Sequence, residues 1–136
     1  MNNTIKPEIG IFILRISLGI VLIAHSLYLK VFVFTLPGTA DFFASLGLPS
    51  ALAYLVFAIE AIAGVALILG YKTRWFAAAT VPVLLGATWA HLPSGWLFSN
   101  SGGGWEYPLF LTLSAVVLFF MGDGAYAFKP RNQKEA

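Results

Sequence analysis

The sequence predicts an all-α integral membrane protein built as a four-helix bundle, and three observations lead to this prediction. Of the 136 residues, 59% are hydrophobic and only 10% are charged, so a soluble fold of this size would expose too much apolar surface. Four apolar segments approach the length that a helix needs to cross a hydrocarbon core of roughly 30 Å. Basic residues gather at alternate ends of these segments, as the loops of a multi-pass protein require.

The first expected helix covers residues 9–29, and charged or titratable groups interrupt its apolar run. The stretch RISLGIVLIAHSLYLK begins with Arg15, contains His25 and ends with Lys30. The run is too long for a cleavable signal and lacks a small-residue cleavage site, so we expect it to remain as a membrane helix. Lys30 is interpreted as a boundary lysine whose amine reaches the aqueous interface.

The first outer loop, over residues 31–50, is too apolar for an ordinary loop. Pro37–Gly38 predicts a turn. Thr39 is the expected cap of a following helix, in which aromatic residues recur at helical spacing. We therefore expect a short helix at the membrane interface, ended by Gly47.

Three further membrane helices are expected, over residues 51–70, 75–91 and 108–121. The last would span about 21 Å at 1.5 Å per residue, which is short of the hydrocarbon core. Either it continues toward Tyr126, or the glycine-rich segment before it enters the membrane. Irregular backbone at that depth is tolerated only where protein or a water-filled cavity covers it, so the second alternative predicts a pocket near the outer face.

The basic residues predict an orientation. Lys6 precedes the first helix, Lys72 and Arg74 lie between the second and third, and three more follow the fourth. With four crossings these positions share one face, and the positive-inside rule places both termini in the cytoplasm. We expect a multi-pass protein of the cell inner (cytoplasmic) membrane, with one domain over 1–128 and a cytoplasmic tail over 129–136. The lipid bilayer is its expected partner, and nucleic acid is not.

Five ionisable residues fall within the expected membrane region, where such residues are functional candidates. By helical rise, Arg15 lies in the inner half, Glu60 near the midplane, and the other three near the outer leaflet. We expect Arg15 to face Glu60, and His25 to face His91 and the GGGWE segment that contains Glu106. Histidine beside carboxylate suits proton transfer near neutral pH. Structural alternatives stay open, namely a helix-joining ion pair, histidines bonded only to carbonyls, and Glu106 at the positive end of its helix.

Five pieces of the sequence match a known pattern: RISLG, AHS, FFASLGLP, IEAIAGVALILGYKTR and HLPSGWLFSNSGGGWEYP. They resemble the DoxX family of small four-helix membrane proteins. The family pattern has a membrane arginine, a histidine with a lysine four residues later, a glutamate, a HxPxG and a GGWEY. These elements fall on Arg15, His25, Glu60, His91 and Glu106. One departure is that Lys30 follows His25 by five residues.

The resemblance implies a link to membrane redox chemistry, as in subunits of a thiosulfate:quinone oxidoreductase or of quinol-oxidase systems. Our first hypothesis is a quinone-linked redox subunit with a polar pocket near the outer face. The candidate catalytic residues are Glu60, His91, Glu106 and His25. The candidate cofactor-binding residues are Arg15, which would keep Glu60 ionised, and the aromatic residues Trp89, Trp96 and Trp105, with Phe98. No flavin or nucleotide motif is recognisable, so a redox protein partner would carry the electron donor.

Other hypotheses stay open. The chain would alternatively be a non-catalytic scaffold or accessory subunit of a membrane redox complex, or a small-solute carrier. A haem or metal site is a further hypothesis, since His25 and His91 lie at similar depth. No local ligand spacing supports that hypothesis, and the absence of cysteine excludes thiolate ligands. The sequence leaves open whether the chain is itself an enzyme and whether it forms a homo-oligomer.

Overall fold

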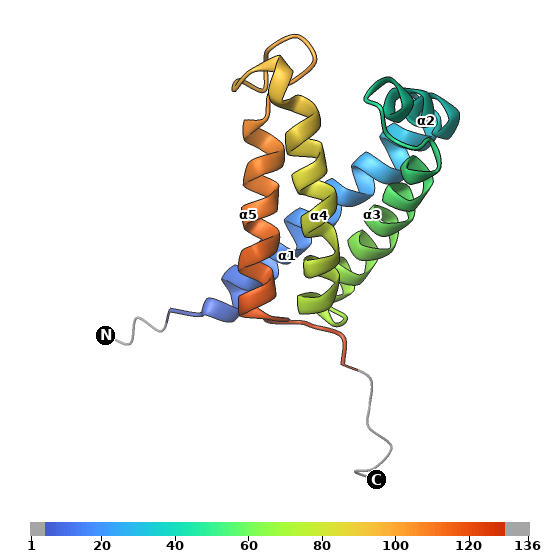
Figure 1. Cartoon of the computed structure of the whole chain (residues 1–136). Coiled ribbons are helices and arrows are strands. Elements are labelled where there is room, and N and C mark those ends of the chain that lie inside the picture. The colour runs from blue at the N-terminus through green and yellow to red at the C-terminus, as the bar shows by residue number, and fades with distance from the viewer. Residues whose placement is uncertain (1–4, 130–136) are drawn as a thin grey trace.

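The computed structural model describes residues 5–129, and within this range the only regular elements are helices (Figure 1). The all-α prediction is therefore confirmed for the described residues. Residues 130–136 of the predicted tail lie outside that range. In chain order the elements are α1 (Pro7–Ile23), the π-helix η1 (Ala24–Val33), α2 (Leu36–Ser45), α3 (Ala51–Leu69), α4 (Thr73–His91), the 3-10 helix η2 (Leu92–Ser94) and α5 (Glu106–Met121).

Among residues 5–129, three helical stretches are long and apolar enough to cross a membrane: Pro7–Val33, Ala51–Leu69 and Thr73–Ser94. The apolar α5 is shorter, with 16 residues, and spans about 24 Å at 1.5 Å per residue. It ends at Met121, where Gly122 adopts a φ of +84°, so the alternative in which this helix continues toward Tyr126 is wrong. Large apolar side chains cover the outer surface of these helices, as expected of a surface that faces lipid.

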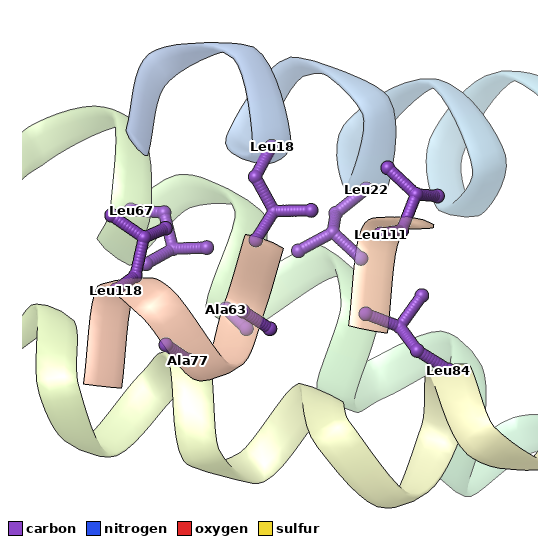
Figure 2. Close-up of a cluster of buried hydrophobic side chains, with 9 residues drawn as sticks. Leu18, Leu22, Ala63, Leu67, Ala77, Leu84, Leu111 and Leu118 are labelled. Atoms are coloured by element: carbon purple, nitrogen blue, oxygen red, sulfur yellow. The ribbon is translucent and has the colours of Figure 1, made fainter. Parts of the chain in front are cut away.

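One hydrophobic core joins α1, α3, α4 and α5. Figure 2 shows leucine and alanine side chains from all four helices pointing into a shared cluster. The buried members are Leu18, Leu22, Ala63, Leu67, Ala77, Leu84, Leu111, Ala115 and Leu118. Around this cluster α1 packs against α3, α3 against α4, and α4 against α5, while α1 also contacts α5.

The helices α1 and α3 cross closely at two glycines. A Cβ atom on Gly19 would lie 2.9 Å from the carbonyl oxygen of Gly64, and one on Gly64 would lie 3.1 Å from that of Gly19. Small residues at such crossings let two backbones approach, which is common between membrane helices. The tight crossing fixes α1 on α3 just before the chain enters η1.

The short helix predicted in the first outer loop is present as α2, but it begins earlier than expected. Thr35, instead of Thr39, is its cap, because the Thr35 hydroxyl accepts a hydrogen bond from the Gly38 N–H at 3.1 Å. The predicted turn at Pro37–Gly38 is wrong, since proline fits the first helical turn, where an N–H has no helical partner. Gly47, with a φ of +79°, terminates the helix as predicted.

The helix η1 continues α1 with π-helical winding and changes neighbours as it does so. The N–H of Phe34 closes its last turn by donating to the Leu29 carbonyl at 2.7 Å. Whereas α1 contacts α5, η1 packs on α3 and α2, and Figure 1 shows it running toward α2 and away from α5. π-Helical segments are rare and are frequent at functional sites. The divergence of η1 from α5 places a cleft at this end of the molecule.

The chain after α5 crosses the opposite end of the molecule (Figure 1). The Ala125 N–H donates to the Glu8 carbonyl at 3.0 Å, and the Phe128 N–H donates to the Leu69 carbonyl at 2.8 Å. These bonds gather the start of α1, the α3–α4 turn and the segment 122–129 at one end.

Candidate functional site

A cleft of about 900 Å³ lies between η1, the start of α5 and the loop 95–105. Its lining is mainly aromatic with few polar groups, as in many small-molecule sites, but the cleft is open on one side. Three of its aromatic side chains are more than half exposed, so the mouth of the cleft faces outward, where the bilayer would lie. The lining residues are His25, Leu29, Trp96, Phe98, Glu106, Tyr107 and Phe110.

His25 supplies the imidazole of the cleft. Its Nδ1 lies 2.9 Å from the carbonyl oxygen of Val21, and a carbonyl can only accept, so Nδ1 carries the proton. The neutral ring then has its lone pair on Nε2. The Tyr107 ring on α5 lies 6.4 Å away between centroids, so His25 bridges η1 and α5 at the cleft.

Glu106 supplies the carboxylate of the cleft and also fixes the loop. Its Oε1 accepts a hydrogen bond from the Phe98 N–H at 3.0 Å, while its own N–H donates to the Trp96 carbonyl at 3.3 Å. Glu106 stands in the first turn of α5, where the helix dipole favours a negative group. The structural alternative given for this residue is thus confirmed, and the same side chain lines the cleft.

The loop 95–105 closes tightly on itself. The Trp105 N–H donates to the Gly95 carbonyl at 3.1 Å, and the rings of Trp96 and Trp105 meet edge to face with centroids 4.5 Å apart. A Cβ atom on Gly104 would overlap the carbonyl group of Leu97, so only glycine fits there. The closed loop holds Trp96 at the cleft with Trp105 behind it.

His91 lies outside the cleft lining. Its Nδ1 donates to the Ala87 carbonyl at 2.7 Å, and its ring packs against Gly103, where a Cβ atom would lie 3.4 Å from the ring carbon Cδ2. His25 was expected to face both His91 and the glycine-rich segment, but His91 itself contacts that segment, at Gly103, and does not line the cleft with His25. Of the predicted polar set, the structure brings only His25 and Glu106 together in the cleft.

Some of the aromatic residues predicted to form the walls of the site line the cleft, and others lie outside it. Trp96 and Phe98 line the cleft, and Trp105 supports Trp96 from behind. Trp89, on α4, is 51% exposed and is not part of the lining. Tyr107 is an additional wall that sequence reasoning missed, although its place directly after Glu106 in the GGWEY piece was available as a signal.

Glu60 has a different partner from the one predicted. Its Oε2 lies 2.6 Å from Lys30 Nζ, and the two side chains are only 8% and 14% exposed. The interpretation of Lys30 as a boundary lysine is therefore wrong, and so is the expected pair of Arg15 with Glu60. The Lys30–Glu60 pair joins η1 to the middle of α3.

The winding of η1 explains why Lys30 reaches Glu60. An α-helix closes its hydrogen bonds over four residues, whereas a π-helix closes them over five. Lys30 follows His25 by five residues. In the π-helical winding of η1, this spacing puts Lys30 one turn from His25, as a spacing of four would in an α-helix. The extra residue between His25 and Lys30, noted as a departure from the family pattern, is absorbed in this way.

Arg15 lies at the opposite end from the cleft, fully buried. Its Nη1 donates to the carbonyls of Leu67 at 2.8 Å and Ile68 at 3.0 Å, and its Nη2 donates to the Ala125 carbonyl at 2.8 Å. A cation at these carbonyls also suits the negative end of the α3 dipole. Arg15 thus ties α1 to the end of α3 and to the segment 122–129.

The described residues also bear on the haem and metal hypothesis. Within residues 5–129, no three His, Cys, Asp or Glu side chains form a group suited to a metal ion. Of the two histidines, only His25 lines the cleft. The geometry therefore offers a single imidazole there, beside one carboxylate.

Comparisons with known proteins agree with the resemblance seen in the sequence. A family model described as DoxX matches residues 10–92, a range that contains Arg15, His25, Glu60 and His91 and ends before the loop 95–105. The chain is also similar to a protein of Bacillus subtilis (strain 168) named "Putative oxidoreductase CatD". The two are 33% identical over 123 residues, which cover 90% of this chain and 87% of that protein. No solved structure matches the chain.

Proposed function

The chain belongs to the DoxX family, and from this premise we propose that it crosses the cell inner membrane four times, with both termini in the cytoplasm. Three long apolar helices and the shorter α5 would supply the crossings. Lys6, Lys72 and Lys129 flank the end where segment 122–129 crosses α1 and α3. Lys30 is paired with Glu60 and leaves no free positive charge at the other end of the described chain. The positive-inside rule then supports this orientation.

The orientation has a direct test, because the chain contains no cysteine. Two single-cysteine variants serve as reporters: Ser99→Cys in the loop 95–105 and Lys129→Cys at the opposite end. Each replaces an exposed residue. On intact spheroplasts, a membrane-impermeant maleimide is expected to label position 99 and not position 129. Labelling of position 129 without permeabilisation would overturn the proposed orientation.

The proposed activity follows from the cleft. The chain binds a quinone-type ring there and serves as a subunit of a membrane oxidoreductase whose redox partner carries the electron donor. One observation carries this proposal: an imidazole and a carboxylate share an aromatic-lined cleft whose mouth faces outward. The ring would lie against Trp96 and Phe98, and an apolar tail would pass Phe110 into the bilayer.

The proposal assigns different roles to the predicted polar residues. His25 and Glu106 would contact the ring oxygens, since both line the cleft. His91 would act as a positioning residue, because its ring packs against Gly103 in the loop 95–105. Glu60 would position η1 through Lys30. The name of the Bacillus relative, "Putative oxidoreductase CatD", supports a redox function in general and does not bear on these residue roles.

Ligand binding tests the proposed function. With the protein in lipid nanodiscs, a short-tailed benzoquinone is expected to quench tryptophan fluorescence saturably, since Trp96 lines the cleft. His25→Leu removes one hydrogen bond of about 1.4 kcal/mol and is expected to weaken binding about tenfold. Trp89→Phe is the matched control, because Trp89 is half-exposed outside the cleft, and its binding constant is expected to match wild type. If quenching is non-saturable in every variant while a redox protein co-purifies, the scaffold hypothesis replaces this one.

A further inference from the structure

An apolar groove of about 330 Å³ lies between α3 and α4, at the end of the molecule where the chain after α5 crosses (Figure 1). We propose that this groove, together with Lys72 and Lys129, binds an anionic phospholipid. One acyl chain would lie in the groove, and the phosphate would contact the two ammonium groups. The groove is at the opposite end from the cleft that contains His25, so this inference goes beyond the proposed function and does not depend on it.

One wall of the groove is a single face of α3. Ile62, Val65, Ala66 and Leu69 line it, at spacings of three, four and seven residues that bring side chains to one face of a helix. The wall extends about 10 Å at 1.5 Å per residue. Ala66 is buried, whereas the other three are at least about half exposed, so the small alanine forms the floor of an open groove. This wall is wholly apolar and therefore fits an acyl chain of the bilayer through van der Waals packing.

Three aromatic rings close one end of the groove. The Tyr71 ring lies 6.2 Å from that of Phe76 and 6.3 Å from that of Phe128, between centroids, and all three side chains line the groove. Phe128 is held there because its N–H donates to the Leu69 carbonyl at 2.8 Å. Tyrosine is enriched where the membrane meets water. The closed end of the groove would therefore lie at the level of the lipid headgroups.

Two lysines directly follow aromatic residues of this closed end. Lys72 follows Tyr71, and its Nζ lies 5.5 Å from the centroid of the Tyr71 ring. Lys129 follows Phe128, and both lysines are exposed. Within residues 5–129, neither lysine forms a salt bridge with a carboxylate. Basic pockets between membrane helices bind anionic lipid headgroups, so the charge here complements a phosphate at the end of the groove.

The backbone of Lys72 gives a second indication that its side chain matters. It adopts a left-handed φ of +44°, which glycine and asparagine adopt more readily than lysine. The turn by itself therefore favours another residue at this position. Asp123, a carboxylate at the same end, accepts the Thr73 N–H at 3.1 Å and is thereby engaged at the start of α4.

Native mass spectrometry of the protein released from detergent micelles measures this lipid preference. Phosphatidylglycerol and phosphatidylcholine with identical acyl chains are titrated separately, so that only the headgroup differs. The first phosphatidylglycerol is expected to bind about thirtyfold more tightly than the first phosphatidylcholine. This ratio corresponds to about fivefold, or about 1 kcal/mol, for each lysine. Soluble glycerophosphate, which has no acyl chain, is expected not to displace the bound lipid.

Variants of the two lysines test the headgroup contact. Lys72→Asn removes the charge and keeps a residue that tolerates the left-handed backbone, and Lys129→Gln removes the other charge. Each is expected to lower the preference for phosphatidylglycerol about fivefold. Arg74→Gln is the matched control, because Arg74 is an exposed cation at the same end whose Nε donates to the Phe119 carbonyl on α5 at 2.9 Å. Its preference is expected to equal that of wild type.

A second pair of variants tests the groove itself. Val65→Phe fills the groove from an exposed position on α3 and is expected to weaken the binding of both lipids about tenfold, because the acyl chain loses its packing contacts. Leu55→Phe is the matched control, since Leu55 is exposed on the same helix and does not line the groove. Unchanged circular dichroism shows that each variant is folded, and the two lysines test the site independently of each other.

Several results would overturn the inference. Equal binding of the two lipids by wild type would do so, as would an equal effect of Val65→Phe and Leu55→Phe. A loss of preference in Arg74→Gln as large as in the lysine variants would show only a diffuse attraction to the basic end. Displacement by glycerophosphate would show a phosphate site that needs no acyl chain. Each of these results leaves the proposed function standing, because ring binding is measured in the cleft at the other end.

Discussion

Replacing Arg15 with methionine is expected to lower the free energy of unfolding by about 3–5 kcal/mol. Arg15 is fully buried, and its guanidinium donates to the carbonyls of Leu67, Ile68 and Ala125. Methionine keeps most of the side-chain volume but removes the guanidinium donors of the Ile68 and Ala125 carbonyls, whereas the Leu67 carbonyl still accepts from the Gly70 N–H at 3.2 Å. Each unsatisfied buried carbonyl costs about 1–3 kcal/mol, and part of this cost is offset because the buried cation is also removed.

Reversible unfolding in mixed micelles, followed by tryptophan fluorescence, measures this effect. Arg74→Met is the matched control, because Arg74 is exposed and donates to a single carbonyl, that of Phe119, at 2.9 Å. A surface change of this kind is expected to cost less than about 1 kcal/mol. Equal losses for the two variants would show that Arg15 does not hold the end of α3 in the way its hydrogen bonds indicate.

The second large effect is expected at the Lys30–Glu60 pair. Glu60→Leu leaves the Lys30 ammonium, only 14% exposed, without its partner, and such a loss costs about 3–5 kcal/mol. The double variant Lys30→Met/Glu60→Leu removes both charges. Its free energy of unfolding is expected to lie within about 1 kcal/mol of the wild-type value or to exceed that value, because apolar replacement also removes the desolvation penalty.

The same unfolding assay, run as a double-mutant cycle, measures the coupling between the two residues. Lys129→Met serves as a control for the loss of an exposed lysine. A double variant as unstable as Glu60→Leu alone would contradict the pairing. In that case each side chain would have its own partners, and the π-helical register of η1 would need another explanation.

The all-α class was predictable from the sequence because composition and segment length decide it. The helices expected over 51–70 and 75–91 correspond to α3 and α4, since Gly70, with a φ of +74°, ends one helix in a way that sequence patterns reveal. The sequence predicts His25, His91 and Glu106 at similar depth because all three flank the outer loops, and of these only His25 and Glu106 line the cleft. Their placement in one cleft agrees with the depth estimated from helical rise.

The partners of the charged residues could not be predicted in the same way. The donors of Arg15 go to backbone carbonyls 52 to 110 positions away in the chain, and every residue has such a carbonyl, so no sequence signal marks them. The error at Lys30 had a different cause. The prediction for Lys30 rests on α-helical geometry, and nothing in the composition of residues 24–33 indicates π-helical winding. That winding rotates Lys30 away from the aqueous boundary and toward Glu60.

The central claim is that the cleft between η1 and α5 binds a quinone-type ring. A density map of the protein purified with its native lipids tests it most directly. The predicted result is planar density against Trp96 and Phe98, with an oxygen at hydrogen-bonding distance from His25 and from Glu106. A cleft filled only by acyl chains, with a ring-shaped ligand bound elsewhere on the protein, would contradict the claim.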